Sequence, residues 1–369
     1  MTVLHNQMTD VTCISHSSNC VGKQLLNVLP LAKRLQEKWS NMIEVSFRAR
    51  QVFQEFSHHK AFRGTEVRWY CWYETCKQIY DHSGAVDYVI NHEDDFSESL
   101  RDDMKLMITP DNKNNLRMEL AIAKDSGERL VHLCYYQEGD TAFLCSTTYD
   151  HWNTTLDFLR QVTSGNVDID AKRLLLPSVA EIAESISDNV NIQNQYIGEA
   201  AAKLLPVYEY MLNDSHATGR LGRTLRILRS CRLFHPKFIA KQNIDALREE
   251  LVHLQNIHIC VHITVESFNL ELEEYKRLAE LWYNGVTEED EQPERQNFIE
   301  KLEDFWLRYA LNIPNWFRAS RDILLICPSS GAIERAFSIL TQGFSDAQAT
   351  AKEDYKAAAV RLRYNSNFH

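Results

Sequence analysis

The spacing of apolar residues along the chain predicts a protein built mainly from helices. Over residues 28–43 the apolar positions recur every three or four residues, which is the period of one helix face. Pro30 stands near the start of this segment, where proline suits a first helical turn because its missing N–H is not needed there. The same pattern continues over 47–56 and breaks at 58–64. We therefore expect one long helix here, with VTCISH (11–16) read as a short strand that leads into it.

Helices are expected along most of the remaining chain. The predicted segments are 67–81, 97–108, 113–138, 141–162, 186–212, 216–233, 238–254, 296–311, 329–342 and about 350–364. A turn at Gly139-Asp140 separates two of them.

The segment GVTEEDEQPER (285–295) predicts a linker. It is acidic, it contains Pro293 and its one apolar residue is Val286. This divides the chain into an N-terminal strand and helix (1–64), a helical region (65–284), the acidic linker (285–295) and a C-terminal region (296–369).

The amino-acid composition also favours a helical chain, and the cysteine pattern indicates the cellular compartment. The 12 glycines and 8 prolines are few for 369 residues, which disfavours a sandwich or barrel with many turns. The nine cysteines are scattered and form no CxxC pair, which is typical of reduced thiols in an intracellular protein. No run of 18 apolar residues exists, so no membrane span is expected.

The net charge of −11 disfavours binding to nucleic acid by bulk attraction. A local exception is the segment 219–237, in which arginines recur every three residues among leucines. If this segment is a helix, the arginines wind around one side and are possible DNA contacts. The alternative is a solvated or ion-paired face, with Glu249 and Glu250 as partners, and the acidic chain favours it. The arginines in question are Arg220, Arg223, Arg226, Arg229 and Arg232.

The segment PSSGAIERAFSIL (328–340) carries the most specific pattern in the chain. A serine after Pro328 can cap a helix whose buried face includes Ile333, Phe337 and Leu340. Glu334 lies in the first turn, where the helix dipole favours a carboxylate. Capping and the helix dipole alone therefore explain Glu334 as a residue that stabilises the N-terminus of this helix.

The segments LLICPSSGAIERAFSIL (324–340) and DYKAAAVRLRYN (354–365) together resemble the C-terminal dimerisation region of hAT-superfamily transposases. Weaker similarities occur in the family's order: CISHSSN (13–19) resembles its Cys-x-x-His motif and EVRWYCWYE (66–74) its RW element. YQEGDTAFL (136–144) and RLFHPK (232–237) resemble further internal markers. The residues that match the family motifs are Cys13, His16, Arg68, Trp69, Ser330, Glu334, Arg335 and Phe337.

The resemblance implies a ribonuclease-H-like α/β core interrupted by a large helical insertion, so that the chain is mainly α with a remnant of that core. It implies DNA strand transfer by two metal ions held between three acids. Glu334 matches the third acid, whereas the other two belong on strands before the Cys-x-x-His motif. Only twelve residues precede Cys13, with Asp10 their one acid, which is too short for those strands. We expect that the chain alone is not a transposase and holds no cofactor, with Mg²⁺ or Mn²⁺ needed only in a longer product that has the missing acids.

Cys13 and His16 also allow a second interpretation, as half of a zinc site completed by HICVH (258–262). Alternate residues of a strand share one face, so HICVH is more simply a partly buried strand. By resemblance, Cys13 and His16 support the active-site end of the core and bind no metal.

The sequence therefore predicts a catalytically incomplete, transposase-derived protein that acts by association. Its expected partner is a second copy or a related transposase, through Ile333, Phe337, Leu340, Tyr355 and Leu362. DNA is a weaker expected partner, a membrane is not one, and a nuclear location follows from the resemblance alone. Two alternatives stay open: a piece of an active transposase whose missing part supplies a zinc finger and two aspartates, and a DNA-binding regulator.

Overall fold

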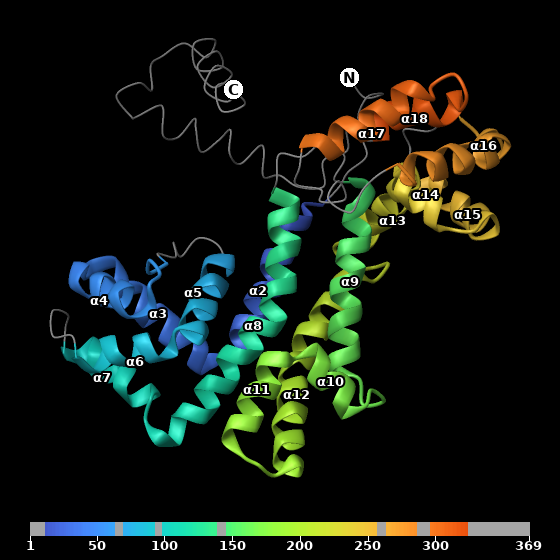
Figure 1. The fold of residues 1–369 in the computed structure, drawn as a ribbon. Helices are drawn as coiled ribbons and strands as arrows, with labels where there is room; N and C mark the ends of the chain where they lie inside the picture. Colours follow the sequence, from blue (N-terminus) through green and yellow to red (C-terminus); the bar gives the residue numbers. More distant parts are fainter. Residues whose placement is uncertain are drawn as a thin grey trace, which may run out of the picture. The chain divides into compact units, whose positions relative to one another are not determined.

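The computed structural model describes residues 12–62, 69–92, 98–138, 145–256, 263–285 and 296–323. Over these ranges helices are the regular secondary structure, and no strand occurs (Figure 1). The prediction of a mainly α chain is confirmed. None of the helices formed by these residues has the length and hydrophobicity needed to cross a bilayer.

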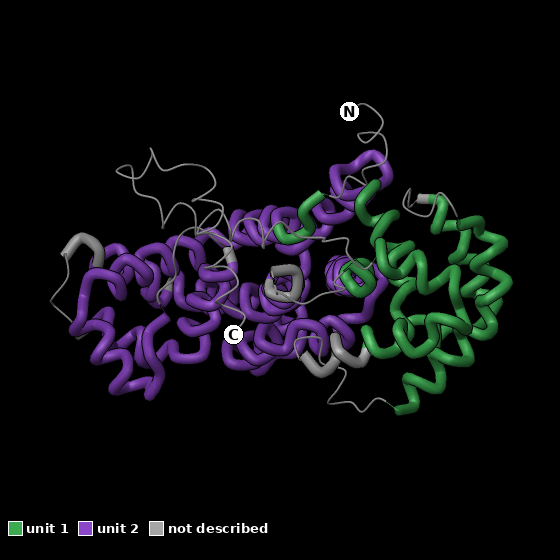
Figure 2. The backbone as a smooth tube through the Cα atoms, turned by 90° about the horizontal axis from the view of Figure 1, so that it is seen from above, with its two compact units in different colours: residues 1–15, 135–149, 223–369 green, residues 16–134, 150–222 purple. Residues whose placement is uncertain are grey.

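The chain folds into two compact units that both use discontinuous segments (Figure 2). Unit 1 contains residues 1–15, 135–149 and 223–369, and unit 2 contains residues 16–134 and 150–222. The predicted linker 285–295 lies, apart from Gly285, outside the described residues.

The start of the described chain corrects two predictions. The strand expected at 11–16 is wrong over its described part, because α2 (Ile14–Asn27) begins at Ile14. The long helix expected up to residue 56 is two helices, α3 (Pro30–Val45) and α4 (Phe47–Ser57).

The break between α3 and α4 occurs at Ser46, which is buried and extended, with φ −96° and ψ 111°. Its hydroxyl accepts a hydrogen bond from the N–H of Ala49 at 3.0 Å and so caps α4. Arg50 donates hydrogen bonds to the carbonyls of Ile43 and Glu44, which belong to the last turn of α3. The apolar period runs through this break because both helices face the same core, so the period alone does not reveal it.

Two helices of unit 2, α3 and α12, each pack against several others. α3 packs against α4, α5 and α7, while α12 packs against α10 and α11 (Figure 1). The helices that follow α4 are α5 (Trp69–Asp81), α6 (Ser83–His92), α7 (Glu98–Met107), α8 (Pro110–Glu138), α9 (Cys145–Thr163), α10 (Ile169–Leu175), α11 (Pro177–Ile186) and α12 (Val190–Ser215). The first and last residues of α8 and α9 agree with the predicted helices 113–138 and 141–162 to within four residues.

Unit 1 has α16 (Val265–Tyr283) at its centre, in contact with α14, α15 and α18. Its other helices are α13 (Gly222–Cys231), η1 (Arg232–Phe234), α14 (Pro236–Lys241), α15 (Ile244–Glu250), η2 (Leu251–Asn256), α17 (Gln296–Arg308) and α18 (Pro314–Ile323). The single helix expected at 238–254 is therefore wrong. Asn243, whose side chain accepts from Ala246 N–H at 2.8 Å, starts a new helix inside that range.

The core of unit 1 is an aromatic cluster. Trp316 lies 4.7 Å from both Phe268 and Tyr275, measured between ring centroids. Both polar aromatic atoms are satisfied within the core: Trp316 Nε1 donates to the Phe268 carbonyl and the Tyr275 hydroxyl donates to the Leu233 carbonyl, each at 3.1 Å. Because the partners are backbone carbonyls, these bonds fix η1, α16 and α18 to one another.

Several helices begin with proline and lack a capping side chain of their own. In unit 2, α3 starts at Pro30 directly after a leucine, which offers no acceptor for the exposed N–H groups. Glu119 of α8 supplies the missing acceptor. Its Oε2 accepts hydrogen bonds from the N–H of Leu31 at 2.7 Å and from the N–H of Ala32 at 3.1 Å. The other oxygen, Oε1, accepts from Lys203 Nζ of α12 at 2.7 Å. One buried carboxylate thus joins three helices.

The same arrangement recurs at α11 and at α18. Asp125, also on α8, accepts from the N–H of Ser178 at 3.1 Å and of Val179 at 3.0 Å, directly after Pro177. In unit 1, Glu271 of α16 accepts from the N–H of Asn315 at 3.0 Å, next to Pro314. A carboxylate at a helix N-terminus satisfies exposed donors and complements the helix dipole, so these acids stabilise the fold.

Candidate functional site

The residues with the strongest motif resemblance lie outside the described part of the chain. This holds for Arg68, the side chain of Trp69, and all of residues 324–369. The predictions for Ser330, Ile333, Glu334, Arg335, Phe337, Leu340, Tyr355 and Leu362 therefore stay predictions.

The arginine segment 220–232 is described in full, and two of its members pair with one carboxylate. Arg229 donates from Nε and Nη2 to the two oxygens of Glu250, at 3.2 and 2.7 Å. Arg232 reaches the same carboxylate at 2.9 Å. Arg232 also lies over two rings, 5.0 Å from the centroid of Tyr149 and 4.5 Å from that of Phe238. This guanidinium therefore holds together parts of unit 1.

The pKa of Glu250 reflects this pairing. Burial raises the pKa of the carboxyl, but the hydrogen bonds and charges of Arg229 and Arg232 outweigh burial, and the net direction is below the ordinary value. Glu250 is thus held as an anion that neutralises part of the arginine segment.

Of the other three arginines, one forms a second ion pair and two are exposed to solvent. Arg220, in unit 2, pairs with Asp214 at 2.8 Å. Arg223 and Arg226 are exposed on α13, and neither forms an ion pair with any residue that the structure describes. The predicted alternative of ion pairing is confirmed for Arg229 and Arg232, whose shared partner is the predicted Glu250. Arg220 is also paired, but with Asp214. The role of the five arginines as DNA contacts stays a prediction. Arg223 and Arg226 remain as exposed cations.

The predicted Cys-x-x-His pair spans the start of α2. Cys13 precedes the helix, while His16 is exposed on it. The imidazole Nε2 of His16 lies 3.7 Å from Sγ of Cys20, one helical turn later. The possible zinc partners at 258–262 fall outside the described residues. Among the side chains that the structure does describe, no three His, Cys, Asp or Glu groups are placed to bind one metal ion.

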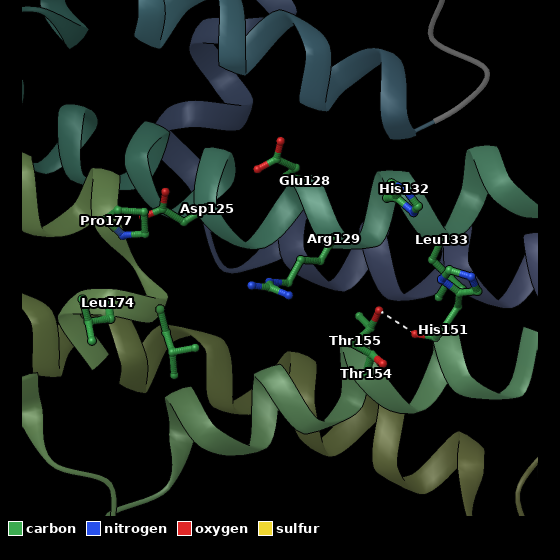
Figure 3. A pocket seen from close by; sticks show the side chains of 11 residues that line it. Asp125, Glu128, Arg129, His132, Leu133, His151, Thr154, Thr155, Leu174 and Pro177 are labelled. Carbon is green, nitrogen blue, oxygen red and sulfur yellow. Dashed lines mark hydrogen bonds between the residues drawn. The ribbon is translucent and has the colours of Figure 1, made fainter. Parts of the chain in front are cut away.

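A cavity of about 420 Å³ lies in unit 2 beside α8 and α9, and none of the predicted residues line it (Figure 3). Arg129 of α8 points toward α9, where its guanidinium lies 4.5 Å from the ring centroid of Phe158. The rings of His132 and His151 are 6.0 Å apart. Glu128 points away from α9 in this view. The cavity has the size of a small-ligand site, and its lining combines the guanidinium of Arg129 and two imidazoles with the carboxyl groups of Asp125 and Glu128.

Sequence reasoning missed this cavity because its residues are ordinary helix-surface residues. Glu128 and His132 are four residues apart on the predicted helix 113–138, and His151 lies on the predicted helix 141–162. That spacing puts Glu128 and His132 on neighbouring positions of one helix, but only the packing of α8 beside α9 brings His151 to His132.

The mainly helical fold agrees with the sequence-based prediction, whereas the strand at 11–16 and the single helix at 238–254 do not. Comparisons with protein-family models, with curated proteins and with solved structures find no match to this chain.

Proposed function

We propose that this chain derives from a hAT transposase, lacks strand-transfer activity by itself, and acts by protein association. The observation that carries the proposal is the resemblance of 324–340 and 354–365 to the dimerisation region of that family. The partner is a second copy of the chain or a related transposase. If a longer product exists, in-frame coding sequence before Met1 should supply two further aspartates on strands.

The described residues agree with this proposal at one point, because from α5 to α16 they form helices, as the helical insertion implied by the resemblance requires. The acids Glu119, Asp125, Glu250 and Glu271 hold helices or arginines in place, so their oxygens are engaged in maintaining the fold.

Association is proposed to use the apolar face of the C-terminal helices expected from the sequence. On a helix, Ile333, Phe337 and Leu340 fall on one side, and Tyr355 and Leu362 lie seven residues apart on another. An apolar stripe that the rest of its own chain does not cover is stabilised by pairing with a second such stripe.

A variant with Phe337→Asp and Leu340→Asp should convert the protein from a dimer to a monomer. Two charges in an apolar contact remove its hydrophobic gain and add the cost of burying carboxylates, so affinity should fall by at least about 100-fold. Size-exclusion chromatography with light scattering over a concentration series measures this directly.

The control is Leu311→Asp, which places one such charge on a leucine that is 94% exposed. It should leave the dimer intact. A wild-type protein that stays monomeric at high concentration contradicts the proposal, and so does a control that dissociates as readily as the test variant.

DNA binding is a second candidate, because Arg223 and Arg226 project from α13 without a carboxylate partner in the described chain. The charge-reversed variant R223E/R226E should weaken duplex binding by about 10-fold or more at roughly 50 mM salt, with a shallower salt dependence. A gel shift at several salt concentrations provides the measurement.

The control for that experiment is R318E/R321E, which reverses two exposed arginines with the same spacing on α18. It changes the net charge by the same amount, so a loss confined to R223E/R226E identifies α13 as the contact. Absence of wild-type binding at low salt, or equal losses in both variants, rules this candidate out.

A further inference from the structure

A cluster of nucleophilic and cationic side chains surrounds Cys20 in unit 2. His16 and Cys20 lie one turn apart on α2, with Nε2 and Sγ separated by 3.7 Å. Nη1 of Arg220 approaches the same sulfur at 3.9 Å from the segment that follows α12. Tyr210, near the end of α12, lies close to the same thiol. Residues far apart in sequence therefore converge on one half-buried thiol.

Arg220 is fixed in the orientation that faces the sulfur. Its Nε and Nη2 donate to the two oxygens of Asp214, at 3.2 and 2.8 Å, which leaves Nη1 directed at Cys20. The hydrogen bond to Asp214 is also the main reason why the pKa of Arg220 is above its ordinary value, so the group stays cationic. The fork of a guanidinium allows both contacts at once, and an ammonium group does not.

The buried cysteines of the described chain differ from Cys20 in a way that matters for reactivity. Burial raises the pKa of the Cys76 thiol well above its ordinary value. Cys145 is buried and donates its S–H to the carbonyl of Ile323 at 3.2 Å. Cys20 is half-buried, so solutes reach it, and a cation and an imidazole lie beside its sulfur. Reactive thiols are found in such partly exposed, electropositive surroundings.

We propose that Cys20 is a modification site, at which hydroperoxides oxidise the thiol to a sulfenic acid. The sulfur attacks one peroxide oxygen, an S–O bond forms and the O–O bond breaks. Two electrons pass from sulfur to the peroxide, and the leaving hydroxide takes up the thiol proton to give water (or the alcohol of an organic peroxide). Arg220 stabilises negative charge on the attacking sulfur, and His16 accepts the thiol proton and passes it on. This inference does not depend on the proposed origin or association of the chain.

The test is the rate of sulfenic acid formation at each cysteine of the full chain, treated with hydrogen peroxide in the presence of dimedone. Mass spectrometry of peptides resolves the sites. Cys13, which is half-buried like Cys20, is the internal reference. We expect Cys20 to react about 10-fold faster than Cys13 in the folded protein, with the difference abolished in urea.

Variants at Arg220 separate this role from a structural one. Arg220→Gln should slow the reaction of Cys20 by roughly 5- to 10-fold, and Arg220→Lys, which keeps the charge, should restore part of it. Arg223→Gln is the matched control, because Arg223 is exposed three residues away and should leave the rate unchanged. His16→Gln, which alters the cluster without touching the Arg220–Asp214 pair, should also slow the reaction.

Equal rates at Cys20 and Cys13 in the folded protein overturn the proposal. The same holds if neither Arg220→Gln nor His16→Gln lowers the rate at Cys20. Circular dichroism confirms the helical content of each variant, and if Arg220→Gln unfolds, the comparison of His16→Gln with wild type decides.

Discussion

Replacing Glu119 by glutamine should lower the free energy of unfolding by about 2–3 kcal/mol, because the buried side chain then faces three donors with one acceptor oxygen. In the wild type, Oε2 accepts from the N–H groups of Leu31 and Ala32, and Oε1 accepts from Lys203. A carboxamide has one oxygen and one NH₂ group. In either orientation of the carboxamide, its NH₂ group points at another hydrogen-bond donor. This donor is a backbone N–H at the start of α3 in one orientation and the ammonium of Lys203 in the other.

The same substitution also removes the negative charge from the first turn of α3, where the helix dipole favours it. Glu119 is 3% exposed, so water cannot replace the lost contacts. The Lys203 side chain is 41% exposed, and its ammonium regains part of its hydration. For this reason we place the effect below that of breaking a fully buried ion pair, which reaches about 3–5 kcal/mol.

Urea denaturation followed by circular dichroism measures the effect as a lower midpoint. The control is Glu128→Gln, the same change nine residues later on α8 at an exposed position. It should stay within about 0.5 kcal/mol of the wild type. A Glu119→Gln protein as stable as this control would show that the carboxylate is not the cap on which α3 depends.

The second large effect is a loss of stability below pH 6.5 that originates at His235. Burial, followed by the positive charge of Lys237, lowers the pKa of this imidazole from 6.5 to about 4. His235 is buried at the start of α14, and its Nδ1 accepts from the N–H of Lys237 at 3.2 Å. Protonation at Nδ1 would turn this acceptor into a donor that faces another donor.

The direction of the effect follows from proton linkage. Between pH 6.5 and about pH 4 the unfolded chain binds a proton at this position and the folded chain does not, so stability falls as the pH falls. One pKa unit corresponds to about 1.4 kcal/mol, so the full difference between neutral pH and pH 4 is about 3 kcal/mol. Above pH 6.5 the stability should not depend on this group.

The measurement is a series of urea denaturations between pH 7 and pH 4, followed by tryptophan fluorescence. Acidic residues also contribute to the slope at low pH, so the informative quantity is the difference from His235→Asn. Asparagine keeps an acceptor at the N-cap but does not titrate. The variant should lose stability at pH 7 and show a shallower decline toward pH 4. Parallel curves for the two proteins would contradict the assignment.

The sequence by itself determined the helical class and the position of several helices. The apolar period over 98–138 and 145–163 was sufficient because it extends over several turns and each helix buries one continuous stripe. For the arginine segment, the acidic composition favoured a solvated or ion-paired face over DNA contacts, with Glu249 and Glu250 as the expected partners, and Glu250 does pair with Arg229 and Arg232. It did not reveal the break at Ser46 or that between α14 and α15, since a short interruption leaves the apolar period almost unchanged.

Only the tertiary structure decided how the proline-initiated helices are capped and which side chains meet. The acceptors for α3, α11 and α18 are Glu119, Asp125 and Glu271, between 44 and 88 residues away along the chain. The contact between Arg220 and Cys20, which are 200 residues apart along the chain, was likewise decided by the tertiary structure. Helix periodicity and capping preferences are local properties that act within a turn or two, so a sequence pattern reports them. A partner supplied by another helix depends on how the helices pack, and no local pattern records that packing.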